Sequence, residues 1–153
     1  TVEMMTRADI RAAGVISVMS NILPGPIQRL AEAITAGDMT AADKLAADMK
    51  PLFGIVGVTT TETSPHGTVQ CKSRNPVPVK TLMNILGMPS GPCRRPLGKL
   101  TRQGIDVTLA AARQLFANDP ELLTPIGDFF SVDIEARLQD ASLIDQLIYT
   151  GSY

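Results

Sequence analysis

The chain has 153 residues, 44% of them hydrophobic, which is enough apolar sequence for one domain with a buried core. Its 14 Lys and Arg residues nearly balance its 15 Asp and Glu residues, so no strong positive field favours a nucleic-acid partner. No apolar run reaches the length of a membrane span, and two cysteines are too few for a disulfide framework. We therefore expect a cytoplasmic protein with reduced thiols and no membrane partner.

The first 37 residues are predicted to form a helix, a strand and a second helix. Residues 1–13 contain no Gly or Pro and carry apolar residues at helical spacing, which predicts a short helix ending at Gly14. The run GVISVMSN follows, and Val15–Val18 within it is predicted to be a deeply buried strand. Residues 24–36 have an amphipathic helical pattern that ends at Gly37. A single strand has no partner for a sheet, and the chain begins with Thr1, so we expect a processed protein or a piece of a longer one.

The middle of the chain is predicted to contain another helix and then an extended region. Thr40 and Asp43 have the spacing of a capping box, and the apolar stripe after them continues to about Phe53. This helix is expected to form an antiparallel hairpin with the preceding one. Residues 54–75 are rich in Thr, Val and Gly, which predicts an irregular excursion or a small hairpin around Ser64–Gly67.

The remaining sequence is predicted to be helical apart from one long loop. Residues 76–87 begin with two prolines, carry an apolar series and end at a glycine, which predicts a helix. Residues 88–97 hold three prolines and must form a loop. A long helix follows and ends at Asp119-Pro120, and the tail has the pattern of two or three short helices.

The order of these motifs resembles the dihydrodipicolinate synthase family, also called 4-hydroxy-tetrahydrodipicolinate synthase. The resemblance rests on GVISV, two helices, NPVPVK at residues 75–80, a Leu-Gly helix end at Leu86-Gly87 and an Arg-Pro-Leu segment at residues 95–97. It covers residues 1–115 and corresponds to the C-terminal part of the family. The connector at residues 54–74 and the tail after Phe116 both extend beyond the usual family pattern.

The resemblance implies a mainly α chain that holds only the end of a (β/α)8 barrel, a fold that needs about 250 residues. Residues 1–37 would supply a helix, strand 8 and helix 8 of the barrel, and residues 38–153 would form the C-terminal helical domain. The other barrel strands would come from an N-terminal portion or a second chain, and a homo-oligomer is expected.

The resemblance also implies a chemistry for the intact enzyme. A lysine amine of the barrel condenses with pyruvate to a protonated imine and releases water, the imine loses a proton to become an enamine, and the enamine adds to aspartate semialdehyde in lysine biosynthesis. The catalytic lysine and tyrosine would lie outside this chain, so we expect it to be inactive alone, with no catalytic residue, metal or cofactor of its own. Ile16 matches the position where the last strand borders pyruvate through its backbone, and it is equally well read as an ordinary strand residue.

Other side chains that often carry chemistry have simpler interpretations. Lys80 falls in the helix-opening NPVPVK, outside the barrel, and is better read as a helix-surface lysine than as an imine-forming one. Ser17 and Ser20 lack a nearby base, and His66 with Cys71 is short of the three or four ligands that a zinc site needs.

Two groups of charged residues are predicted to lie at the surface. The basic group is expected to be solvated or to pair with acidic residues of another subunit, and the acidic group is expected to be solvated. A basic cluster, which has the composition to bind a phosphate or a carboxylate, comprises Arg94, Arg95, Lys99 and Arg102. Carboxylates are scattered over the tail at Asp128, Asp133, Glu135, Asp140 and Asp145.

Two hypotheses about function follow. The chain is either the C-terminal part of a Schiff-base lyase or a separate, non-catalytic helical module with an interaction or regulatory role.

Overall fold

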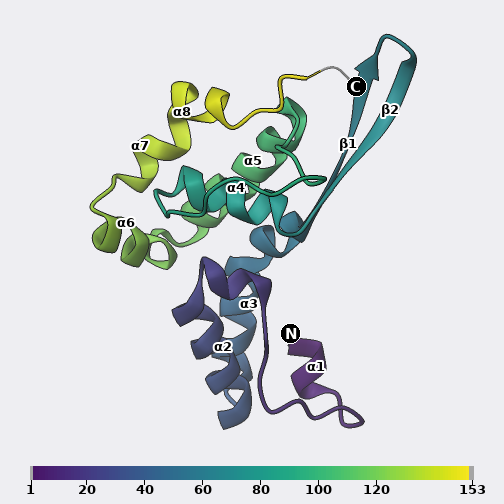
Figure 1. The fold of residues 1–153 in the computed structure, drawn as a ribbon. Coiled ribbons are helices and arrows are strands. Elements are labelled where there is room, and N and C mark those ends of the chain that lie inside the picture. The colour runs from purple at the N-terminus through teal and green to yellow at the C-terminus, as the bar shows by residue number, and fades with distance from the viewer. Residues whose placement is uncertain (1, 152–153) are drawn as a thin grey trace.

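The computed structural model describes residues 2–151, and they are mainly helical, as predicted (Figure 1). The α-helices are α1 (Val2–Thr6), α2 (Pro24–Ala36), α3 (Met39–Phe53), α4 (Val77–Ile85), α5 (Arg102–Asn118), α6 (Thr124–Phe130), α7 (Ile134–Gln139) and α8 (Ala141–Gln146). Short 3-10 helices are η1 (Val18–Asn21), η2 (Gly54–Val56) and η3 (Pro120–Leu122), and the strands are β1 (Gly57–Ser64) and β2 (Gly67–Arg74).

The first helix is much shorter than predicted. The predicted helix covered residues 1–13, of which residue 1 lies outside the described part, whereas α1 ends at Thr6. Met5 is the one buried residue of α1, so little tertiary packing is present to stabilise a longer helix. Arg7 instead bonds the Asp9 carboxylate two residues on, and Arg11 takes a positive φ of 46°.

The predicted strand at Val15–Val18 does not form in this chain. Residues 15–17 make no ladder with any described residue, and Val18 already opens η1. Ser17 keeps extended dihedral angles, with φ −114° and ψ 135°. The expected deep burial is also wrong for the isolated chain, because Ile16 is fully exposed. A strand needs a neighbouring strand to bond its backbone groups, and the described chain places none beside this segment.

The next two helices, α2 and α3, lie side by side (Figure 1). Gly37 ends α2 in the left-handed conformation, with φ 77°, and allows the chain to reverse. The side chain of Asp38 then accepts the Ala41 N–H at 3.0 Å and caps α3. The predicted capping box at Thr40 and Asp43 is therefore wrong, because α3 has already begun at Met39 and Asp38 is its cap.

The region left open between an irregular excursion and a hairpin is a long antiparallel hairpin. β1 and β2 pair in register from Gly57↔Arg74 to Ser64↔Gly67. The hairpin projects from the helical body (Figure 1). Only its base is buried, where Val58 and Thr60 of β1 pack near α5.

The core lies between α3, α4 and α5. Its fully buried members include Leu52 from α3, Leu82 from α4 and Ile105 and Leu115 from α5. The same buried cluster extends to η1 and α2, so the core includes the N-terminal part of the chain.

Two arginines attach the C-terminal tail to this core. On α7, Arg137 donates to the carbonyls of Ile85 and Asn84 at the end of α4, at 2.6 and 2.9 Å. On α5, Arg113 donates twice to the carbonyl of Leu138 near the end of α7, at 3.1 and 2.7 Å. Each arginine thus places its positive charge at carbonyls near the C-terminal end of a helix, where a cation is favoured.

Candidate functional site

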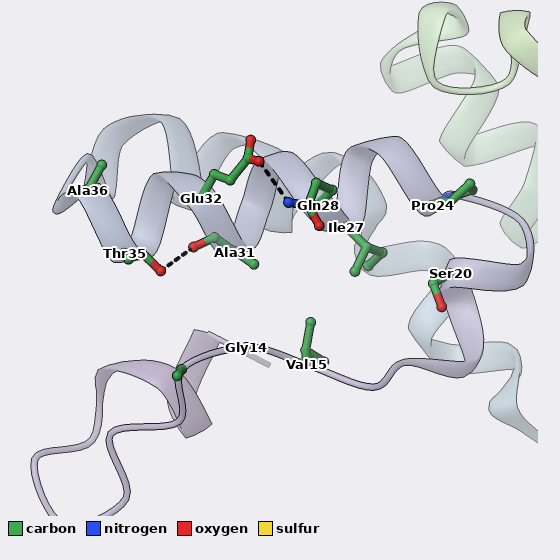
Figure 2. Close-up of a pocket in the computed structure, with 11 residues that line it drawn as sticks. Gly14, Val15, Ser20, Pro24, Ile27, Gln28, Ala31, Glu32, Thr35 and Ala36 are labelled. Atoms are coloured by element: carbon green, nitrogen blue, oxygen red, sulfur yellow. Dashed lines mark hydrogen bonds between the residues drawn. The ribbon is translucent and has the colours of Figure 1, made fainter.

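An open groove runs along α2, between this helix and the extended N-terminal segment (Figure 2). Its volume is about 670 Å³. We call it the α2 groove, and its lining residues are Ala13, Gly14, Val15, Ser20, Pro24, Ile27, Gln28, Ala31, Glu32, Thr35 and Ala36.

The floor of the α2 groove is apolar and its rim is polar. Val15 points toward α2 and is half-buried, and Ile27 is buried (Figure 2). On the rim, Gln28 donates to the Glu32 carboxylate at 2.7 Å, and the Thr35 hydroxyl donates to the carbonyl of Ala31 at 2.9 Å (Figure 2). The groove is therefore suited to receiving an apolar segment with hydrogen-bonding edges.

The lining of the α2 groove supplies no amine for Schiff-base chemistry. None of its residues is a lysine, tyrosine, histidine or cysteine. Its one carboxylate, Glu32, is already engaged by Gln28. Schiff-base chemistry requires an amine, so another part of a protein would have to bring it to this site.

Ile16 lies next to the α2 groove but does not line it. Side chains alternate along an extended segment, and the neighbouring Val15 points toward α2 (Figure 2). The Ile16 side chain has a relative accessibility of 107%, which is complete exposure. None of the described residues therefore covers Ile16.

The two serines of GVISVMSN have structural roles. The Ser17 hydroxyl accepts the Met19 N–H at 3.2 Å and caps η1. The Ser20 hydroxyl donates to the carbonyl of Ser17 at 2.5 Å. Both hydroxyls are committed to local backbone groups, as expected of residues that start a turn of helix.

The structure places Lys80, His66 and Cys71 away from the α2 groove lining. The Lys80 ammonium donates to the carbonyl of Pro92 at 3.1 Å. His66 is exposed in the hairpin turn, and Cys71 lies on β2 opposite Thr60. Across residues 2–151, no three His, Cys, Asp or Glu side chains are grouped to hold a metal ion.

The tail carboxylates act mainly as helix caps and ion-pair partners. Asp133 caps α7, and Asp145 pairs with Arg102. Asp140 caps α8, where the Leu143 N–H and then the Ser142 hydroxyl lower the pKa of its carboxyl. The carboxylates Asp128 and Glu135 are exposed, as predicted.

The basic cluster is divided by the fold. Arg95 and Lys99 line a second cleft together with Lys80, whereas Arg94 is not part of that lining and Arg102 is paired with Asp145. Sequence reasoning missed the grouping with Lys80. The only available signal was the proline-rich loop between Lys80 and Arg95, which can return the chain to the helix it has just left.

With this geometry established, comparison with known proteins identifies the family. The model of the dihydrodipicolinate synthetase family matches residues 2–114. The chain belongs to this family. The match covers the extended segment, the α2 groove and the NPVPVK helix, and it confirms the resemblance read from GVISV and residues 75–80.

The relatives of this dihydrodipicolinate synthetase family chain are much longer than it is. It is 34% identical over 101 residues to a 4-hydroxy-tetrahydrodipicolinate synthase of Moorella thermoacetica, covering 66% of this chain and 30% of that protein. Identity to the synthases of Methanoculleus marisnigri and Desulforudis audaxviator is 36% over 91 residues and 37% over 90, covering 60% and 59% of this chain and 26% of each relative. The aligned part thus spans less than a third of these relatives.

Two further searches found nothing. No solved structure matches the chain significantly. Among the helices of residues 2–151, none combines the length and the apolar character needed to cross a bilayer.

Proposed function

We propose that this chain is the C-terminal part of a pyruvate-dependent Schiff-base lyase that condenses pyruvate with aspartate semialdehyde in lysine biosynthesis. One observation supports this proposal most strongly. The extended segment around Ile16 is unpaired, Ile16 is fully exposed, and the segment lies beside the open α2 groove within the residues that match the family. These are the features expected where the rest of a barrel has been removed. In this proposal residues 1–37 complete the barrel and residues 38–153 form the helical domain beside it.

The exposed backbone at Ile16 supports its proposed role in the assembled enzyme. Once residues 15–18 pair with neighbouring strands, their N–H and C=O groups would be satisfied in a ladder. The C-terminal ends of barrel strands border the active site, so the backbone at Ile16 would line the pyruvate pocket. The reactive amine and the proton-relay tyrosine would come from the missing part, because the α2 groove supplies neither.

The test compares the chain alone with the chain co-expressed with an N-terminal barrel portion of a full-length relative. We expect no turnover of pyruvate with aspartate semialdehyde by the chain alone, and no adduct when pyruvate is trapped with borohydride. Co-expression should restore both. Trapping of pyruvate on Lys80 of the isolated chain would refute the assignment of roles, and a Lys80→Arg variant would identify that site.

The second candidate is a separate helical module with an interaction or regulatory role. It is favoured by one observation, the single buried core that α3, α4 and α5 share, to which Arg137 and Arg113 attach the tail. Sedimentation of the purified chain distinguishes the two. A monomer that melts cooperatively and does not bind the barrel portion supports the module, whereas a self-associating species that is rescued by the barrel portion supports the lyase.

In the lyase proposal the assembled protein is a cytoplasmic homo-oligomer. The expected partners are pyruvate, an aldehyde and the N-terminal barrel portion.

A further inference from the structure

A second cleft shares no lining residue with the α2 groove and lies in the helical part of the chain after the hairpin. It has a volume of about 610 Å³ and is bounded by α4, the loop at residues 88–99 and the segment at the end of α8. Three cationic residues line it, namely Lys80, Arg95 and Lys99. None of the described residues that line it is acidic. We call it the basic cleft.

Both lysines of the basic cleft are held in place by its own walls. The Lys80 ammonium donates to the carbonyl of Pro92 at 3.1 Å, and the Lys99 ammonium donates to the carbonyl of Gln146 at 2.7 Å. Both acceptors belong to residues that also line the cleft. A carbonyl orients an ammonium without neutralising it, and two of the three donors on each lysine remain for a ligand.

Arg95 adds a guanidinium that has no hydrogen bond or ion pair with any residue of the described chain. Asp145, on α8 near this cleft, is paired with Arg102. Within residues 2–151, none of the three cations of the basic cleft forms an ion pair with an acidic side chain. Like charges gathered around one cavity repel each other, and a bound anion removes that repulsion.

The remaining wall provides apolar contact. Leu97 and Leu147 line the cleft, and its volume lies within the range of about 300–1,000 Å³ that is typical of small-molecule sites. An organic group can therefore lie against the leucines while an anionic group meets the cations.

We propose that the basic cleft binds a small phosphate monoester. A phosphate group carries close to two negative charges at neutral pH and three terminal acceptor oxygens, which matches two lysines and one arginine. A monocarboxylate offers only two oxygens and one charge. This proposal concerns the helical domain alone, and it holds whether or not the chain completes a barrel.

The test is a titration of the full chain with inorganic phosphate and with phenyl phosphate at constant ionic strength, in which isothermal titration calorimetry measures binding. Arg95→Gln should weaken binding of both probes at least tenfold. The matched control is Arg94→Gln, which removes the same charge from the adjacent residue outside the cleft lining, and it should leave binding unchanged. An equal loss in both variants would show non-specific attraction and would overturn the proposal, as would succinate binding as tightly as phosphate.

Alkylation of Cys93 provides a second measurement of binding, in which the three cationic residues of the basic cleft are left unchanged. Its thiol is half-buried and lines the basic cleft, whereas the other cysteine, Cys71, lies on β2. In a Cys71→Ser background, phenyl phosphate should slow the alkylation of Cys93 by iodoacetamide. An alkylation rate unchanged at saturating phenyl phosphate would overturn the placement of the ligand in this cleft.

Discussion

Substituting Ile16 with aspartate separates the stability of this chain from its ability to assemble. Ile16 is fully exposed, so Ile16→Asp removes no buried apolar surface from the isolated chain. Its free energy of unfolding should change by no more than about 0.5 kcal/mol, as for other surface substitutions. Urea unfolding followed by circular dichroism measures this change directly.

In an assembled barrel the same substitution should be severe. Burying an isoleucine side chain contributes about 1.5–3 kcal/mol, and an aspartate at that place adds the cost of desolvating a charge. A loss of about 3 kcal/mol or more weakens association with the barrel portion at least about a hundredfold. Co-purification and restored lyase turnover report this loss.

The matched control is Val107→Asp. Val107 is also an exposed apolar residue, but it lies on α5 and not in the extended segment. It should leave both stability and assembly unchanged. If Ile16→Asp destabilised the isolated chain by more than about 1.5 kcal/mol, the exposure of this segment would be wrong. If it assembled as well as the control, Ile16 would not lie in the proposed interface.

Three further predictions concern residues 52–140. Arg137→Ala should lower the free energy of unfolding by about 2–3 kcal/mol in urea, because two charge-assisted bonds to the end of α4 are lost, and Arg137→Lys should retain part of it. Leu52→Ala should cost about 2–5 kcal/mol in the same assay, since Leu52 is completely buried, and a smaller loss would mean that the core collapses around the cavity. The lowered pKa of Asp140 means that its cap stabilises the fold fully above the ordinary aspartate pKa of about 4, and that this contribution disappears as the pH falls through the folded value. Melting temperatures of Asp140→Asn should accordingly show a weaker decline on acidification than those of the unchanged chain, and parallel curves would contradict the assigned cap.

Local signals in the sequence were sufficient for the helices of the body. The prolines before Ile27 and the glycine at position 37 bracket α2, and the apolar stripe through Ile105 and Leu115 identifies α5. These features depend on contacts within a few residues, so the chain alone encodes them. The family relationship was likewise readable from GVISV and NPVPVK.

Long-range contacts decided the rest. Val15–Val18 has the composition of a strand, yet a strand exists only with a partner, and the described chain offers none. Whether residues 54–75 would pair was undecided because Thr-rich and Gly-rich sequence fits both a loop and a ladder, and the in-register pairing of β1 with β2 settled it.

The sequence by itself determined most of the helical elements and the family. Only the tertiary structure showed that Lys80 meets Arg95 and Lys99 in one cleft, and that Ile16 is left exposed. The physical reason is the same in both cases. Helix formation is set by neighbours along the chain, whereas a charge cluster or an unfilled interface is set by which distant segments the fold brings together or leaves apart.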